Sequence, residues 1–198
     1  MMNENTFEIN RKMFHVILGV IFVFSIYYGV LAFWMALALL IISICFSLLS
    51  IKYSLPIINL FLLKYDRPEH SRTPAKGVIS IFSALSVLLL LMESSILSKN
   101  IVLASLMIWT FGDSLSAVVG KLYGRNKHPL NNRFMEGTIA GVIGGTIGAL
   151  FFVPIYAAFP VAVITMTIES LELKFLKHPI DDNLLVPLIA AGLLVWIL

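Results

Sequence analysis

The chain has 198 residues, of which 59% are hydrophobic and only 13% are charged, and its formal net charge is +3. A soluble domain carries about 25% charged and 45–50% apolar residues, so this composition excludes an ordinary soluble domain and indicates an integral membrane protein. The single cysteine, Cys45, excludes an internal disulfide. The positions of the basic residues along the chain explain the net positive charge better than binding to nucleic acid does, so we expect no nucleic acid as a partner.

About seven apolar stretches follow one another along the chain, without repeats or linkers. Backbone groups in lipid must be hydrogen-bonded internally, so each stretch is predicted to form a helix. About 20 residues cross the hydrocarbon layer, so the shorter stretches need flanking residues or a thinner bilayer. We expect a single all-α domain over residues 1–198, a polytopic transmembrane bundle of about seven spans, or six if 157–172 is only partly inserted. The stretches lie near 13–28, 30–51, 77–93, 101–121, 138–154, 157–172 and 183–198.

Two segments near the N-terminal half allow more than one interpretation. Residues 1–12 are polar and no cleavage site follows the first apolar run, so we expect a retained first helix and not a signal peptide. The stretch 53–66 contains Pro56 and is too short to cross a membrane. It is either an interfacial helix or a continuation of the second helix.

The basic residues predict how the chain is oriented in the membrane. Cytoplasmic loops of membrane proteins carry an excess of Lys and Arg. With a cytoplasmic N-terminus, all of the 14 Lys and Arg residues except Lys99 fall on the cytoplasmic side, as do all acidic residues except Glu93. We therefore expect the N-terminus and the active site at the cytoplasmic face of a prokaryotic cell membrane, or of the ER membrane in a eukaryote.

Asp113 lies inside the fourth apolar stretch. A charged side chain near the middle of the membrane costs about 2.5–3.5 kcal/mol on insertion scales, which makes this carboxylate a candidate functional residue. It either pairs with a neighbouring helix, or binds a divalent cation that carries nucleotide phosphates, or acts as a base toward a lipid hydroxyl. Gly112, Gly120 and Gly124 around it allow backbones or phosphates to approach closely. Arg125 opens a basic loop whose charges either bind phosphate or only flank the membrane on its inner side. Together with Ser114 and Lys121, these residues are the expected nucleotide contacts.

A second group of carboxylates lies near the start of the last apolar stretch. Glu169 is close to the inner end of the preceding stretch, and Asp181 and Asp182 precede Asn183. An Asp or Asn here can cap a helix, but two adjacent carboxylates exceed what a cap requires. Mg²⁺ is commonly held by one or two carboxylates together with substrate phosphates. If the helices bring them together, Asp113, Glu169, Asp181 and Asp182 are the predicted ligands of Mg²⁺ or another divalent cation, and Asn183 is predicted to contact the nucleotide.

The fifth apolar stretch begins with residues suited to an anion. Arg133 precedes Glu136, Gly137 and Thr138, and the free N–H groups at a helix start favour phosphate. Capping of the helix by Glu136 and Thr138 is the alternative. The glycines that follow at close spacing predict a face on which two helices pack tightly, and these are Gly137, Gly141, Gly144, Gly145 and Gly148.

Two more segments carry candidate residues. Arg11 and Lys12 either anchor the chain at the membrane surface or bind phosphate, and His15 lies about one turn further inside the first stretch. Lys76 opens the third stretch and offers another phosphate contact of low specificity.

Taken in order, these motifs resemble the family of CTP-dependent lipid kinases, which includes dolichol (polyprenol), phytol and diacylglycerol kinases. The resemblance covers most of the chain. The family has Lys-Ser/Thr-x-Glu-Gly where this chain has the run from Arg133 to Gly137; arginine still binds phosphate, but Phe134 lacks the hydroxyl. The matching motifs are Glu8…Arg11-Lys12…His15, Lys76-Gly77, Gly112-Asp113-Ser114…Gly120…Gly124-Arg125, Glu136-Gly137-Thr138 and Glu169…Asp181-Asp182-Asn183…Pro187.

The resemblance implies transfer of the γ-phosphate of CTP to a membrane lipid alcohol, with a divalent cation. A polyprenol or dolichol-type prenyl alcohol is the expected acceptor, and phytol and diacylglycerol are the others. The expected catalytic residues are Asp113, Asp182 and His15, and the expected partners are CTP, the lipid alcohol and membrane lipids. The alternatives are a phosphatidate cytidylyltransferase, which forms a CDP-lipid from CTP, and an ion- or proton-coupled transporter. The sequence does not indicate an oligomeric state.

Overall fold

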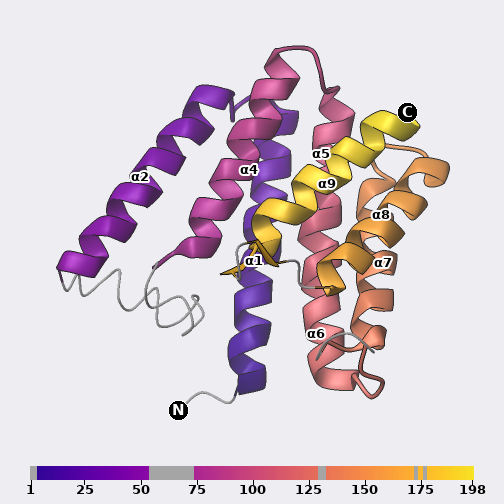
Figure 1. The fold of residues 1–198 in the computed structure, drawn as a ribbon. Coiled ribbons are helices and arrows are strands. Elements are labelled where there is room, and N and C mark those ends of the chain that lie inside the picture. The colour runs from indigo at the N-terminus through magenta and orange to yellow at the C-terminus, as the bar shows by residue number, and fades with distance from the viewer. Residues whose placement is uncertain (1–3, 54–73, 129–132, 172–173, 176–177) are drawn as a thin grey trace.

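The computed structural model describes residues 4–53, 74–128, 133–171, 174–175 and 178–198 (Figure 1). The regular structure of this part is helical apart from one short antiparallel ladder, in which β1 (Lys174–Phe175) pairs with β2 (His178–Pro179). The helices are α1 (Glu4–Tyr27), α2 (Phe33–Lys52), α4 (Lys76–Glu93), α5 (Lys99–Met107), the π-helix η2 (Ile108–Asp113), α6 (Ser114–Tyr123), α7 (Met135–Ala149), α8 (Ile155–Ser170) and α9 (Asp182–Ile197).

The predicted apolar stretches all form helices, and the predicted all-helical class is confirmed. Four helical segments are long and apolar enough to cross a membrane, namely Thr6–Tyr27, Phe33–Lys52, Lys76–Glu93 and Lys99–Tyr123. This identifies an integral membrane protein. Helices α8 and α9 are apolar but shorter. The predicted segment 53–66 lies, beyond its first residue, outside the described residues.

A tight turn follows the first helix. Helix α1 ends at Tyr27 and α2 begins at Phe33, and between them Gly29 has a φ of 72°. A positive φ of this kind is readily adopted by glycine, which has no Cβ. The turn therefore reverses the chain without a polar loop.

The two charged residues predicted on the non-cytoplasmic side both join helix ends. The Glu93 carboxylate accepts a hydrogen bond from the Phe33 backbone N–H at 2.9 Å, and the Lys99 ammonium donates to the Tyr27 carbonyl at 2.5 Å. Backbone groups at helix ends lack intrahelical partners, so these side chains satisfy them. Glu93 and Lys99 therefore have a structural explanation at this end of the bundle.

The long helical segment Lys99–Tyr123 lies at the centre of the arrangement. Helix α7 packs along α5, η2 and α6, while α9 packs against α4, α5 and α8. The end of α8 and the start of α9 lie beside the middle of this central segment, whereas α1, α6 and α7 continue further toward the end that carries the N-terminus (Figure 1). Because α8 ends and α9 begins there, two helix ends meet the central segment close to Asp113.

The predicted glycine face on α7 packs against the central segment. A Cβ at Gly141 would lie 2.9 Å from the Gly112 carbonyl oxygen, and one at Gly144 would lie 3.1 Å from the Phe111 carbonyl oxygen. A Cβ at Gly137 would come within 2.5 Å of the Ser116 carbonyl oxygen. Only glycine lets the two backbones approach this closely, which is the behaviour expected of small residues between membrane helices.

Candidate functional site

The central segment carries a π-helix at the position of its carboxylate. η2 interrupts the α-helical hydrogen-bonding pattern over Ile108–Asp113, and Asp113 is its last residue. π-Helical turns are rare and are often found at functional sites. Nothing in the apolar pattern of the sequence predicted this interruption.

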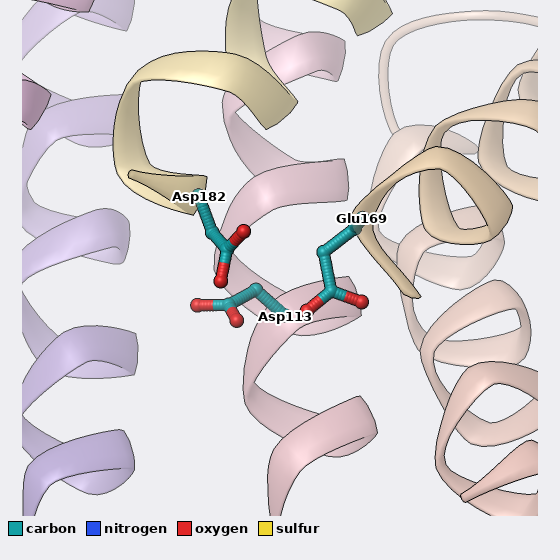
Figure 2. Close-up of side chains that lie close together, drawn as sticks. All are labelled: Asp113, Glu169 and Asp182. Atoms are coloured by element: carbon teal, nitrogen blue, oxygen red, sulfur yellow. The ribbon is translucent and has the colours of Figure 1, made fainter. Parts of the chain in front are cut away.

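Three carboxylates from three different elements converge beside η2 (Figure 2). Asp113 comes from η2, Glu169 from the last turn of α8 and Asp182 from the first turn of α9. One oxygen of each lies within 4.8 Å of those of the other two. Asp113 and Glu169 are buried, with 4% and 1% exposure, while Asp182 is half-buried. Like charges this close in a medium of low dielectric repel each other, so the cluster requires cations.

Two basic side chains meet this requirement. The Lys12 ammonium, which is 2% exposed, lies 2.7 Å from both carboxylate oxygens of Asp113. The Arg133 guanidinium contacts Glu169 through Nη1 and lies 3.0 Å from Asp182 Oδ2 through Nη2. Among the described residues, three carboxylates thus share two cations in direct contact, and this excess of negative charge suits a further cation.

His15 is the second side chain of α1 at the cluster. Its Nε2 lies 3.5 Å from Asp113 Oδ2 and has no hydrogen-bond partner within the described part of the chain. The imidazole ring packs against the Trp109 ring with 4.1 Å between the centroids. Arg11 turns elsewhere and pairs with Glu8, one turn earlier on α1, at 2.5 Å. α1 therefore presents Lys12 and His15, but not Arg11, to Asp113.

The structure gives different roles to the two adjacent aspartates at the start of α9. The Asp181 carboxylate accepts a hydrogen bond from the Asn183 backbone N–H at 3.0 Å and caps the helix. Asp182, one residue later, is the one grouped with Asp113 and Glu169. Of the four predicted ligands, the structure thus brings three together, and the fourth, Asp181, caps the helix.

The predicted anion site at the start of α7 is occupied by the protein's own groups. The backbone N–H groups of Gly137 and Thr138 donate to the Phe134 carbonyl, at 3.1 and 3.3 Å. The Glu136 carboxylate accepts from the Asn126 backbone N–H at 3.0 Å and from the Asn126 side-chain amide at 2.7 Å. Glu136 is thus bonded to Asn126, and the N-cap residue Phe134 makes no side-chain cap hydrogen bond, so the described contacts do not show the capping alternative either.

The glycines around Asp113 serve close helix packing in this structure. A Cβ at Gly112 would lie 2.8 Å from the Met166 sulfur, and one at Gly120 would lie 3.5 Å from Gly137 Cα. A Cβ at Gly124 would overlap the Phe134 ring. The atoms that surround these glycines belong to neighbouring helices and to Phe134, so they give no support to the predicted contact with the nucleotide.

The remaining predicted residues lie around the cluster at different depths. Lys121 and Arg125 are exposed at the end of α6, and Lys76 is half-buried at the start of α4. The Ser114 hydroxyl is buried directly after Asp113 and makes no hydrogen bond to the described residues. Asn183 follows Asp182 and accepts a hydrogen bond from Trp109 Nε1 at 3.1 Å.

Two residues at the site were not predicted from the sequence. Trp109 contacts both His15 and Asn183, and the Ser116 hydroxyl donates to Glu169 Oε2 at 3.5 Å. Both were detectable in principle, because they lie four residues before and three residues after Asp113. Side chains at these spacings share one helix face.

No protein-family model, curated protein or solved structure matches this chain. The fold and the site define a class by themselves, an integral membrane protein with a buried cluster of carboxylates and basic residues. Charged residues within membrane helices are rare and mark sites of ion or substrate handling.

Proposed function

We propose that this protein is a CTP-dependent lipid kinase, which transfers the γ-phosphate of CTP to a lipid alcohol at the cytoplasmic face of the membrane. One observation carries the proposal, namely the convergence of Asp113, Glu169 and Asp182 from three apolar helices beside Lys12 and Arg133. Phosphoryl transfer demands little covalent chemistry from the protein, which mainly positions the reactants and offsets charge. A cluster of this composition suits both tasks.

The donor set fits a hard divalent cation such as Mg²⁺. Such cations prefer carboxylate oxygens and usually take one or two of them in addition to substrate phosphates. Asp113, Glu169 and Asp182 would hold the cation, which would offset the negative charge of the CTP phosphates when bound. Arg133 contacts two of these carboxylates, so the guanidinium and the cation compete for the same oxygens. A guanidinium released in this way is well suited to a phosphate group.

In the proposed reaction, the lipid hydroxyl oxygen bonds to the γ-phosphorus while the bond from that phosphorus to the β–γ bridging oxygen breaks, and CDP leaves. The hydroxyl proton passes to a base at the site. His15 Nε2 is the proposed acceptor, because it has no hydrogen-bond partner among the described residues and lies 3.5 Å from Asp113. A carboxylate of the cluster is the second candidate. Lys12 holds the Asp113 carboxylate by two contacts of 2.7 Å.

The proposed acceptor is a polyprenol or dolichol-type prenyl alcohol that enters laterally between helices. We propose that the seven helical segments cross the membrane with the N-terminus inside. In this topology the charge-poor ends of α1, α2, α4 and α5 lie outside, and the cluster lies toward the cytoplasmic half, where α8 ends and α9 begins. CTP, which is water-soluble, and the lipid hydroxyl would then reach the cluster from different directions.

The first test supplies the purified full-length protein in detergent with γ-labelled CTP, Mg²⁺ and a panel of polyprenol, phytol and diacylglycerol. Label in a lipid phosphate is the expected result, and the preferred acceptor identifies the substrate. Formation of a CDP-lipid from phosphatidic acid with release of pyrophosphate would instead establish a cytidylyltransferase. Absence of both reactions, with ion flux in proteoliposomes, would establish a transporter.

A further inference from the structure

Trp109 differs from the other tryptophans of the chain in its surroundings. Trp34 and Trp196 are 71% and 85% exposed, whereas Trp109 is 2% exposed inside η2. The indole N–H is a donor that is costly to bury without an acceptor. Trp109 Nε1 donates to Asn183 Oδ1 at 3.1 Å, which satisfies it.

The acceptor of this hydrogen bond belongs to the turn that carries Asp182. Asn183 follows Asp182 in the first turn of α9, and its side-chain amide also donates to the Gly77 carbonyl on α4 at 3.4 Å. A Cβ at Gly77 would lie 2.9 Å from that amide nitrogen, so glycine leaves the space the amide needs. The Asn183 side chain thus ties the start of α9 to η2 and to α4.

The indole ring of Trp109 makes the second contact. It packs on the His15 imidazole with 4.1 Å between the centroids and 50° between the planes. His15 Nε2 has no hydrogen bond within the described chain and lies 3.5 Å from Asp113. The imidazole is positioned there by this ring packing together with a hydrogen bond to the Trp109 backbone. The π-helical turn places Trp109 and Asp113, four residues apart, in contact with the same residue of α1.

We propose that Trp109 is a positioning residue, which sets Asp182 through Asn183 and sets His15 through ring packing, and so fixes the distance of both from Asp113. One side chain in η2 thereby aligns α1, which carries His15, and α9, which carries Asp182. The effect of Trp109 on the affinity for the divalent cation follows from the geometry of the carboxylates. Its effect on turnover rests on the lipid kinase function proposed above.

The test compares the Mg²⁺ affinity of the wild-type full-length protein with that of its variants. The affinity is measured by calorimetry in detergent, without CTP or lipid. Trp109→Phe keeps a smaller aromatic ring and removes the N–H, and Asn183→Leu removes the acceptor. Each is expected to weaken Mg²⁺ binding about two- to tenfold, as befits the loss of one hydrogen bond. The double variant is expected to weaken Mg²⁺ binding by less than the two single effects combined, because both substitutions remove the same Trp109–Asn183 bond. Trp196→Phe, on an exposed ring, is the matched control.

A spectroscopic measurement keeps the proposal testable if Trp109→Phe fails to fold. In the Trp34→Phe/Trp196→Phe protein, Trp109 is the only tryptophan left of the 3 in the chain. Saturation with Mg²⁺ is expected to change its emission, and Asn183→Leu in the same background is expected to abolish this change. The positioning role would be overturned if the emission of Trp109 did not change with Mg²⁺, or if both single variants had the Mg²⁺ affinity of the wild type.

The catalytic half of the proposal has its own readout. In the phosphoryl-transfer assay, Trp109→Phe is expected to raise the Mg²⁺ concentration for half-maximal rate and to leave the KM for the lipid unchanged. An unchanged Mg²⁺ requirement would contradict the role in catalysis. If the protein transfers no phosphate but Trp109 responds to Mg²⁺ as described, the lipid kinase function fails and the positioning role stands.

Discussion

At the scale of single residues, the pairing of Lys12 with Asp113 determines how variants of the site must be designed. Both side chains are buried, and the ammonium lies 2.7 Å from each carboxylate oxygen. Removal of one partner of a buried ion pair leaves an uncompensated charge, whereas removal of both is much less costly. Loss of activity in a single Asp113 variant therefore mixes a catalytic and a folding effect.

Asp113→Asn is expected to destabilise the protein by about 3–5 kcal/mol, because Lys12 is left buried without a carboxylate. The double variant Lys12→Met/Asp113→Asn is expected to recover most of this stability while transferring no phosphate. Unfolding by SDS titration gives the stability, and the labelled-CTP assay gives the rate. Lys127→Met, at an exposed position, is the control and should stay within about 0.5 kcal/mol. Transfer by the stable double variant would contradict a role of Asp113 in the reaction.

Arg133 offers a variant whose effects on two ligands have opposite signs. Its guanidinium contacts Glu169 and Asp182, the carboxylates proposed to hold the cation. Arg133→Met is expected to tighten Mg²⁺ binding in the absence of CTP at least about tenfold, because a competing charged hydrogen bond is gone. The same variant is expected to raise the KM for CTP, because a phosphate contact is lost. Calorimetry and steady-state kinetics measure the two effects, and a weaker affinity for Mg²⁺ would refute the competition.

At the scale of elements, the interface of α7 with the central segment holds Asp113 in its place. The backbones approach so closely at Gly141 that a methyl group would meet the Gly112 carbonyl oxygen at 2.9 Å and the Met166 sulfur at 3.0 Å. Met166 belongs to α8 and lies one turn before Glu169. The same contact thus sets the separation of the elements that carry two of the three carboxylates.

Gly141→Ala is expected to destabilise the protein by about 1–3 kcal/mol, the usual cost of an overpacked interior. The matched control is Gly192→Ala on α9, where no atom lies within 4 Å of an added Cβ. That change should be neutral or stabilising by up to about 1 kcal/mol, because alanine favours helix over glycine. Thermal unfolding in detergent compares the two. Equal effects at both positions would show that the α7 packing is looser than described.

At the scale of the whole molecule, charge is distributed so that one end of the bundle carries almost all of it. Lys99 and Glu93 tie helix ends together at the other end, through the Tyr27 carbonyl and the Phe33 N–H. Lys and Arg near the ends of membrane helices are found in excess on the cytoplasmic side of a membrane. The asymmetry supports the proposed orientation.

The orientation is testable with the chain's single cysteine removed. In a Cys45→Ser background, Asn100→Cys is expected to react with a membrane-impermeant thiol reagent on intact cells, and Lys127→Cys only after permeabilisation. Both positions are exposed in the structure, so accessibility within the protein is matched. Reaction of Lys127→Cys from outside, with Asn100→Cys protected, would reverse the orientation.

Much of the fold was predictable from the sequence, because lipid leaves a chain few choices. Backbone groups without water must form helices, so each apolar stretch predicted a helix and the excess of Lys and Arg predicted an orientation. The candidate carboxylates were also recognisable, because an acidic residue in an apolar stretch is costly and rarely accidental. Local composition was sufficient for these inferences.

Only the tertiary structure decided how the candidate residues are grouped. It assigned Lys12 to Asp113, Arg133 to Glu169 and Asp182, and Asp181 to the cap of α9. The contacts of Lys12 and Arg133 join residues far apart in the chain, and they depend on a π-turn and on close helix packing at glycines. The sequence by itself thus determined the helices and the inventory of charges, because both follow from local chemistry. The partners of those charges were decided by distances between helices, which no local pattern specifies.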